Sequence, residues 1–231
     1  MADRNYIFAS TKPWNIAAFM AVRDQLPGRW SVITGRDDLD PALIAALDPR
    51  YIFFPHWNWI VPKPLLERFE CVCFHMTDVP YGRGGSPLQN LIARGHDQTK
   101  LTALRMSDVL DAGDVYAKSA LSLAGAAHEI FDRAAHEAIK LLQWIVLNEP
   151  TPQPQSGEVT TFKRRTPDQS LLPDTHGLQA VYDHIRMLDA EGYPKAFLTH
   201  GGLRLEFADA RFDDGCLTAQ VSLTETRTKA P

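Results

Sequence analysis

Residues 71–87 of the 231-residue chain read CVCFHMTDVPYGRGGSP, and this stretch decides the fold. Its first five residues, Cys71 to His75, form a short apolar run of the kind found in buried strands. Glycine and proline crowd the remainder, so the strand must end near His75 and give way to a loop. In an open α/β sheet, ligands gather beyond the carboxyl ends of the strands. The stretch therefore predicts a sheet with His75 at the edge where a binding or catalytic group would lie.

On both sides of this stretch, apolar strand-like runs alternate with helix-like runs. We predict strands at 6–9, 30–34, 51–54, 71–75, 101–106 and 115–121, and helices at 14–26, 41–47, 62–69, 87–93 and 126–146. In the longest of these helices, apolar residues recur every three or four positions. Alternation of this kind predicts the α/β class: a Rossmann-like, mostly parallel sheet with helices on both faces.

A proline-rich segment at residues 148–157 has the composition of a semi-rigid linker. We therefore predict an N-terminal domain at 1–150, followed by the linker and a small C-terminal subdomain at 151–231. The subdomain is predicted to be an α+β appendage, with a helix at 178–188 and strands at 196–199, 203–207 and 217–223.

Composition narrows the class of protein. Apolar residues make up 45% of the chain and charged residues 23%, as in ordinary globular proteins. No apolar run approaches the roughly 20 residues that span a bilayer, and no signal-peptide core is visible at the start of the sequence. We therefore expect a cytoplasmic protein with no membrane partner. The three cysteines lack the spacing of a disulfide framework or a zinc site, so we assign no metal.

The charge balance bears on the choice of partner. The net charge is −4, and the only dense basic cluster is Lys163-Arg164-Arg165. Proteins that grip nucleic acid usually carry a basic stripe or patch. We therefore expect no nucleic-acid partner.

A second motif, Leu110-Asp111-Ala112-Gly113-Asp114, follows the strand predicted at 101–106. Alone, Asp-x-Gly-Asp is a common turn, and His75 alone fits a satisfied buried histidine. Their order, spacing and flanking residues together carry more information. With CFHMTDVP at 73–80 and RGGSP at 83–87, the chain resembles the folate-dependent formyltransferase family. The family pattern is Asn-x-His-x-Ser-x-Leu-Pro, then Arg-Gly-x-x-Pro, then Leu-Asp-x-Gly-Asp.

The resemblance implies the formyltransferase fold and a co-substrate, N10-formyltetrahydrofolate, with no metal. It also implies that His75 and Asp111 are catalytic. An amine of the acceptor attacks the formyl carbon, and the oxyanion that forms needs a hydrogen-bond donor such as His75. Asp111 then holds the imidazole, or an ordered water that moves the amine proton to the leaving nitrogen. Because the nucleophile belongs to the acceptor, the chain needs no serine or cysteine nucleophile.

Cys73 departs from the pattern, because it stands where the family has asparagine, and we include it in the catalytic set on that ground. A thiol is a weaker donor than an amide, and loss of one oxyanion donor typically costs about 3 kcal/mol. Asn58 and Thr77 are the candidates to substitute for the amide. Between a covalent nucleophile and a packed strand cysteine, the packed cysteine is the favoured interpretation.

The resemblance further implies that two loops border the pterin ring of the folate. We assign folate contacts to Trp57, Asn58, Trp59 and Ile60 and to Ser107, Asp108, Val109 and Leu110. Two tryptophans give flat apolar walls that suit a heterocycle, although interior packing would explain them as well.

The acceptor is expected along the glycine loop and the basic cluster. We assign substrate contacts to Thr77, Pro80, Tyr81, Gly82, Arg83, Lys163 and Arg164. Arginine forks suit phosphates, and glycine lets a ligand approach the backbone closely. For Lys163 and Arg164, a solvated charged strand is an equally good explanation.

The tail favours one branch of the family. Residues 185–197, IRMLDAEGYPKAF, resemble a stretch that follows the catalytic domain of sugar N-formyltransferases. Together with a short tail and an acidic chain, this resemblance predicts formyl transfer to a nucleotide-linked amino sugar in surface polysaccharide biosynthesis. A homodimer is compatible with the same resemblance. The alternatives are a methionyl-tRNA formyltransferase-like enzyme, a formyltetrahydrofolate hydrolase, and a non-catalytic folate- or nucleotide-binding descendant.

Overall fold

The structure, a computed structural model, describes residues 4–174 and 177–226 of the chain. It consists of two compact units, each assembled from several chain segments. The first unit contains Met1–Pro87, Thr99–Leu121 and Phe131–Phe162, and the second contains Leu88–Gln98, Ser122–Ile130 and Lys163–Pro231. The units interleave along the chain, whereas the predicted division into 1–150 and 151–231 is a single boundary, which stays a prediction.

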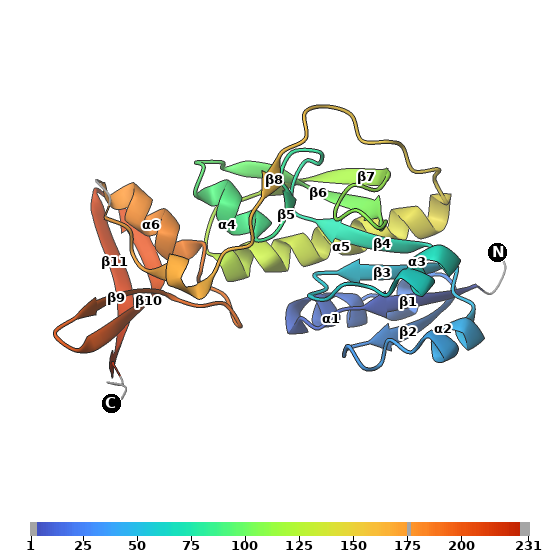
Figure 1. Cartoon of the computed structure of the whole chain (residues 1–231), viewed down its shortest axis with the longest axis horizontal. Helices are drawn as coiled ribbons and strands as arrows, with labels where there is room; N and C mark the ends of the chain where they lie inside the picture. The colour runs from blue at the N-terminus through green and yellow to red at the C-terminus, as the bar shows by residue number, and fades with distance from the viewer. Residues whose placement is uncertain (1–3, 175–176, 227–231) are drawn as a thin grey trace. The chain divides into compact units, whose positions relative to one another are not determined.

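A six-stranded sheet forms the centre of the first unit (Figure 1). Its strand order is β2-β1-β3-β4-β6-β7, with β1 Asn5–Ala9, β2 Arg29–Ile33, β3 Tyr51–Pro55, β4 Cys71–His75, β6 Gln98–Arg105 and β7 Val115–Ser122. The pairs β1–β2, β1–β3 and β3–β4 are parallel, and the pair β4–β6 is antiparallel. The predicted mostly parallel sheet is confirmed.

One face of this sheet is covered by α2 (Pro41–Leu47) and α3 (Lys63–Arg68). Successive strand residues point to opposite faces, so each face has its own apolar cluster. On this face, Ile44 of α2 and Leu65 of α3 belong to one buried cluster with Ile52 of β3.

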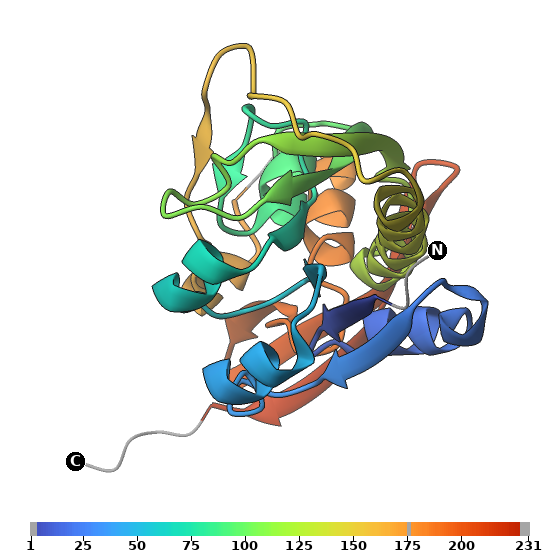
Figure 2. The ribbon, with the colours of Figure 1, turned by 90° about the vertical axis from the view of Figure 1, so that its right-hand side faces the viewer.

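The opposite face is covered by α1 (Pro13–Met20) and α5 (Ala127–Asn148). Phe19 of α1 stacks on Phe8 of β1, with ring centroids 4.1 Å apart. Figure 2 shows α2 and α3 on one side of the strands β1 and β3 and α1 on the other. Helices therefore lie on both faces, as predicted.

Across the described residues, no helix combines the length and apolar character needed to cross a membrane.

Local signals explain where these helices begin and end. The Asp40 carboxylate accepts from the backbone N–H of Ala42 at 2.7 Å, so it caps the N-terminus of α2. The helix predicted at 14–26 is shorter in the structure, because α1 ends at Met20 and a separate 3-10 turn, η1 (Arg23–Gln25), leads towards β2.

A short two-stranded sheet joins the glycine loop to the chain beyond the proline-rich segment. Its strands are β5 (Arg83–Gly84) and β8 (Thr161–Phe162), which run parallel. Neither is predicted from sequence, because two residues give no periodicity. Gly84 is required here: its φ is +102°, and a Cβ would lie 2.4 Å from the backbone oxygen of Phe162. The glycine loop is therefore pinned before α4 (Pro87–Ile92) begins.

The second unit is built on a three-stranded antiparallel sheet in the order β11-β10-β9. Its elements are η2 Pro167–Ser170, α6 Leu178–Arg186, β9 Ala196–His200, β10 Leu203–Asp213 and β11 Cys216–Glu225. Helix α6 packs against β10 and β11. The predicted α+β appendage is confirmed, with a longer β10 than expected, because pairing resumes beyond a bulge after Ala208.

The stretch 185–197 has a structural role in this unit. Arg186 donates to the backbone oxygen of Leu123 at 2.6 Å. Asp189, which is 4% exposed, forms an ion pair with Lys195. Buried charges need such partners, so these residues are explained by the folding of the second unit.

Candidate active site

His75 lies at the carboxyl end of β4, where the sequence predicts it, and is 8% exposed. Its Nε2 atom lies 2.8 Å from the backbone oxygen of Gly82. Because a carbonyl oxygen only accepts, Nε2 must carry the hydrogen of this bond. The other ring nitrogen, Nδ1, is then the atom that can gain or lose a proton.

Asp111 supplies a carboxylate that faces this nitrogen. Its Oδ2 atom lies 3.5 Å from His75 Nδ1 and accepts a hydrogen bond of 2.9 Å from the backbone N–H of Gly84. The backbone of Asp111 has φ +53°, a left-handed conformation that costs a non-glycine residue about 1 to 2 kcal/mol. The structure thus brings the two predicted catalytic residues together in one buried site, at the expense of local strain.

Cys73 stands two residues before His75 on the same strand, so both side chains lie on the same face of the sheet. Burial, reinforced by the negative charge of Asp111, raises the pKa of the Cys73 thiol. The group therefore stays a neutral thiol at pH 7, a weak hydrogen-bond donor with little nucleophilic character. The structure gathers Cys73, His75 and Asp111 in one place.

The two loops assigned to folate approach each other beside this site. Trp57 and Met106 pack against the same apolar cluster as Cys73. Lys63, at the start of α3, forms an ion pair of 3.2 Å with Asp108 of the second loop. Trp57 therefore lies on the sheet face that carries Cys73 and His75, and Asp108 connects the second loop to the start of α3.

Several side chains of these loops face solvent. Asn58 and Ser107 are exposed, and the exposed fractions of the large apolar residues are 38% for Trp59, 83% for Ile60, 63% for Val109 and 60% for Leu110. Trp57 differs, because its indole Nε1 is buried and has no hydrogen-bond acceptor within the described part of the chain. All eight assignments to folate contact stay predictions.

Most residues assigned to the acceptor are engaged within the first unit. Thr77 is fully buried, and its hydroxyl donates to the Gly82 oxygen at 3.2 Å. Its single donor hydrogen is thereby used, so it does not replace the missing amide. Pro80 is also buried, and Tyr81 packs edge-on against Phe162 with ring centroids 5.5 Å apart.

The charged residues assigned to the acceptor belong to both units. The Arg83 guanidinium donates to the side-chain oxygen of Gln155, from Nε at 3.1 Å and from Nη2 at 2.8 Å. Lys163 and Arg164 are exposed and belong to the second unit. Contact of these three residues with a substrate stays a prediction.

Gln155 is the residue of this region that sequence reasoning missed. Its side-chain Nε2 donates to the backbone oxygens of Asp111 and Gly113, each at 2.8 Å. The residue lies within the proline-rich segment read as a linker, and a lone glutamine there carries no recognisable signal.

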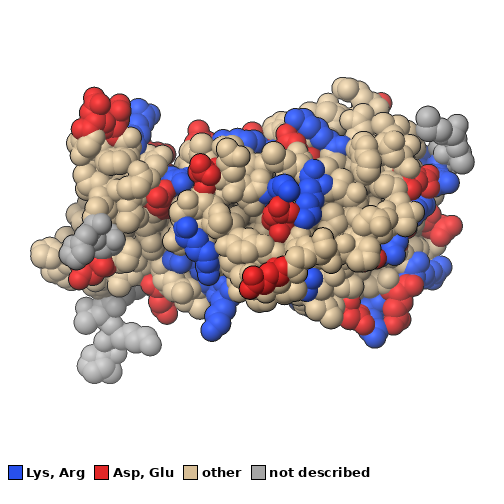
Figure 3. Space-filling model, turned by 90° about the horizontal axis from the view of Figure 1, so that it is seen from above, with Lys and Arg blue, Asp and Glu red and all other residues tan. Residues whose placement is uncertain are grey.

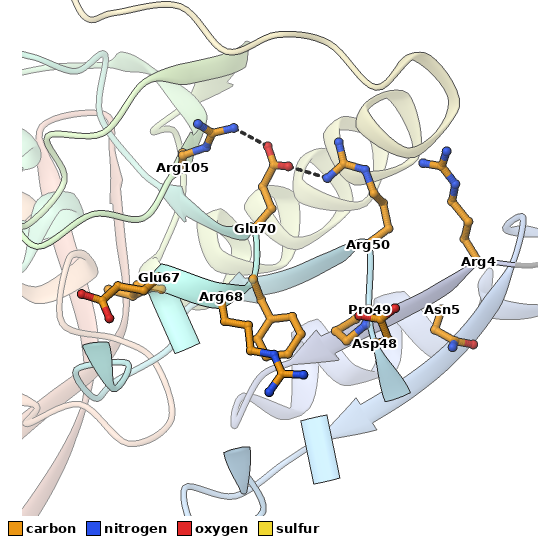
Figure 4. Close-up of a pocket in the computed structure, with 11 residues that line it drawn as sticks. Arg4, Asn5, Asp48, Pro49, Arg50, Glu67, Arg68, Glu70 and Arg105 are labelled. Carbon is orange, nitrogen blue, oxygen red and sulfur yellow. Dashed lines mark hydrogen bonds and ion pairs between the residues drawn. The ribbon is translucent and has the colours of Figure 1, made fainter. Parts of the chain in front are cut away.

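A hollow of about 710 Å³ lies away from this site, where β3 and β4 begin (Figure 4). Three of the four arginines that line it are paired with carboxylates: Arg4 and Arg50 with Glu149, and Arg50 and Arg105 with Glu70. The fourth, Arg68, is exposed and lies over the Phe69 ring. Guanidinium groups paired in this way form a structural network rather than an open anion site.

Among the described residues, no three histidine, cysteine, aspartate or glutamate side chains group as a metal site would require.

The fold and the site have counterparts in known proteins. Residues 167–224 match the family model for the C-terminal domain of methionyl-tRNA formyltransferase. The structure of a methionyl-tRNA formyltransferase from Clostridium thermocellum is 44% identical and superposes with a TM-score of 0.93, over 96% of this chain and 99% of that chain. The methionyl-tRNA formyltransferase of Bacillus mycoides is 29% identical over 179 residues, which cover 74% of this chain and 56% of the relative. The chain therefore spans about half the length of the curated relatives it matches.

These similarities overturn two predictions, the nucleotide-linked amino sugar as acceptor and the absence of a nucleic-acid partner. A sugar N-formyltransferase from Shewanella has a TM-score of 0.67 over 95% of this chain and 97% of that chain, but is only 13% identical, which shows a shared fold alone. The amino-sugar prediction relied on residues 185–197, and it was wrong for a physical reason. These residues stabilise the second unit, so their sequence carries no information about the acceptor. With 44% identity across nearly the whole of both chains, the chain belongs to the formyltransferase family.

Proposed function

We propose that this chain transfers a formyl group from N10-formyltetrahydrofolate to the amino group of methionyl-tRNA. The observation that carries the chemistry is the buried pair of His75 and Asp111, with Nδ1 and Oδ2 3.5 Å apart. The choice of acceptor is supported by the 44% identity with the Clostridium thermocellum methionyl-tRNA formyltransferase.

The residues beside this pair fit a folate. Trp57 offers a buried indole N–H with no acceptor among the described residues, and buried donors normally have one. Ile60 and Val109, 83% and 63% exposed, add apolar surface to the two loops. Apolar walls with a few polar groups are typical of ligand sites. Trp57 and the two loops would hold the pterin ring, and the folate would supply the activated formyl carbon.

His75 and Asp111 handle the proton that the acceptor amine loses. The Gly82 oxygen holds Nε2–H, so the ring is fixed with Nδ1 towards the carboxylate. When Nδ1 takes up this proton, the Asp111 charge stabilises the imidazolium, which then returns the proton to the leaving nitrogen of the folate as its bond to the formyl carbon breaks. Gly84 N–H keeps Oδ2 of Asp111 in place. The low exposure of both side chains strengthens these interactions by excluding water.

A chain of net charge −4 can act on a tRNA if it reads the aminoacyl end and makes few backbone contacts. Single-stranded RNA ends are recognised by stacking and by base edges, whereas the number of phosphate contacts sets the electrostatic part of binding. On the face drawn in Figure 3, acidic and basic side chains are interspersed. Without a basic stripe, few contacts to the phosphate backbone of a tRNA are expected, but a tRNA acceptor is still compatible with the charge. The prediction of no nucleic-acid partner failed because it relied on charge alone.

Incubation with N10-formyltetrahydrofolate and methionyl-tRNA tests the proposal. Mass spectrometry is expected to show one formyl group gained on the methionine, while nucleotide-linked amino sugars, used as control acceptors, stay unmodified. Release of formate without any acceptor would identify a hydrolase. Folate binding by calorimetry with no transfer to methionyl-tRNA would identify a non-catalytic descendant. Either result would contradict the proposal.

A further inference from the structure

Gln155 makes four hydrogen bonds through one side-chain amide. Its Oε1 accepts from Nε and Nη2 of Arg83 at 3.1 and 2.8 Å. Its Nε2 donates to the backbone oxygens of Asp111 and Gly113, each at 2.8 Å. A half-buried amide with all of these bonds made is a strong constraint on the two segments that it joins.

The chemistry of the partners fixes the orientation of this amide. A guanidinium only donates and a backbone oxygen only accepts, so Oε1 must face Arg83 and Nε2 must face the turn at Asp111. The opposite orientation would oppose donors to donors and acceptors to acceptors. The two ends of Gln155 therefore cannot exchange roles.

The backbone delivers Gln155 to this position. Val115 and Gln153 form an antiparallel bridge, with N–H to oxygen distances of 2.7 and 2.8 Å in the two directions. In antiparallel register, the residue two places after Gln153 lies opposite the residue two places before Val115, which pairs Gln155 with Gly113. A Cβ on Gly113 would lie 1.8 Å from the backbone oxygen of Arg105, so the turn itself is closely packed.

We propose that Gln155 is a positioning residue that sets the approach of Asp111 to His75. Through Nε2 it holds the strained, left-handed turn at Asp111. Through Oε1 it holds Arg83, and the glycines on either side of Arg83 bond directly to the catalytic pair. One amide thereby links the loop of the imidazole to the loop of the carboxylate. Its kinetic consequence rests on the proposed function.

Gln155→Glu is the sharpest test, because it preserves shape and the acceptor for Arg83 while removing both donors. The new carboxylate oxygen would face two backbone oxygens, so Asp111 is expected to shift. We expect kcat to fall about 10- to 100-fold, as for a misplaced catalytic group. The KM for formyltetrahydrofolate should change by less than about threefold, because no ground-state contact is lost.

Gln153→Glu is the matched control. It makes the same chemical change two residues away, at an exposed side chain whose amide donates only to the nearby Thr151 oxygen. Its kcat is expected to stay within about twofold of wild type. Gln155→Met removes all four hydrogen bonds without adding a charge, and its kcat should also fall. This variant provides the test if Gln155→Glu does not fold.

Amide hydrogen exchange at Gly84 gives a readout independent of turnover, because its N–H donates to the Asp111 carboxylate. Exchange at Gly84 should accelerate in the Gln155 variants and not in Gln153→Glu. Wild-type kcat in both Gln155 variants, or a change in KM alone, would overturn the proposal. If wild-type protein transfers no formyl group, the proposed function fails separately, and unchanged Gly84 exchange in the variants would then overturn the positioning role.

Discussion

At the scale of the residue, the site depends on which atom holds which proton. The Gly82 oxygen assigns one hydrogen to Nε2 of His75, and the Asp111 carboxylate makes Nδ1 the exchanging atom. Cys73 stands beside this pair with a raised thiol pKa, caused by burial and then by the charge of Asp111. A neutral thiol leaves the carboxylate free to act on the imidazole.

The protonation of Cys73 predicts slow alkylation. Iodoacetamide reacts with thiolates, so at neutral pH Cys73 and the buried Cys71 should react far more slowly than the exposed Cys216 in the same chain. Peptide mass spectrometry over a time course measures all three rates together, with Cys216 as the internal control. Labelling of Cys73 as fast as Cys216 in folded protein would show that its thiol is activated.

At the scale of the element, the turn between β6 and β7 is shaped by close backbone packing. Gly113 has no room for a side chain, because a Cβ would meet the Arg105 oxygen at 1.8 Å. At Gly35, by contrast, a Cβ would approach only the end of the Asp38 side chain, at 3.0 Å. A mobile side chain can give way, whereas strand backbone cannot.

Gly113→Ala is therefore expected to lower the free energy of unfolding by about 1 to 3 kcal/mol, as other overpacked sites do. Gly35→Ala is the control and should stay within about 0.5 kcal/mol of wild type. Urea denaturation of the three proteins measures both values. Equal stability of the two variants would mean that the turn tolerates a methyl group and is less rigid than described.

A second element-scale feature is the ion network at the edge where β3 and β4 begin. Burial alone would raise the pKa of Glu70, but hydrogen bonds from Tyr116, Arg105 and Arg50 outweigh it, and the pKa is lowered. Because the folded pKa lies below the unfolded one, the stabilisation is present above the unfolded pKa. It is lost as the pH falls through the folded pKa.

Glu70→Gln should accordingly cost about 1 to 3 kcal/mol at pH 7, by leaving charged donors without their acceptor. The difference from wild type should shrink as the solution is acidified through the carboxylate range. Glu67→Gln, which removes a charge 65% exposed and 3.6 Å from Lys63, should cost less than about 0.5 kcal/mol. Denaturant unfolding between neutral and acidic pH follows both. If Glu70→Gln lowered the free energy of unfolding by the same amount at every pH, its effect would come from the shape of the side chain and not from its charge.

The elements also show what sequence can predict. The sheet, His75 at the end of β4 and the carboxylate in the turn at Asp111 were all accessible, because periodicity and local motifs encode them. The pairing of β5 with β8 and the clamp at Gln155 were not, because each depends on register between distant segments. The proline-rich segment was predicted to be a linker because its composition indicates a stiff chain. Its contacts could not be predicted, because they depend on the strand with which it pairs.

At the scale of the whole molecule, the acceptor was misjudged because composition averages over the surface. A net charge of −4 describes long-range attraction to nucleic acid and says little about recognition of one aminoacyl end. The proposed acceptor rests instead on similarity over nearly the full length of both chains.

The same charge predicts weak salt dependence of tRNA binding. Lys163-Arg164-Arg165 is the only dense basic cluster in the sequence, and the Arg165 guanidinium already donates to the backbone oxygen of Gln169, so about two phosphate contacts are expected. Raising the salt from roughly 50 to 200 mM should then weaken methionyl-tRNA binding about tenfold, against about a thousandfold or more for a protein with six contacts or more. Filter binding across this range measures the slope. A steep slope would indicate a basic surface that the charge balance conceals.

The most direct test of the account is single-turnover formylation of methionyl-tRNA by wild type and by Asp111→Asn. The substitution keeps the shape of the side chain but removes the charge that faces Nδ1 of His75. We expect the rate of formyl transfer to fall by about a thousandfold, with unfolding and folate binding unchanged. A rate within about tenfold of wild type would contradict the catalytic role of the His75 and Asp111 pair.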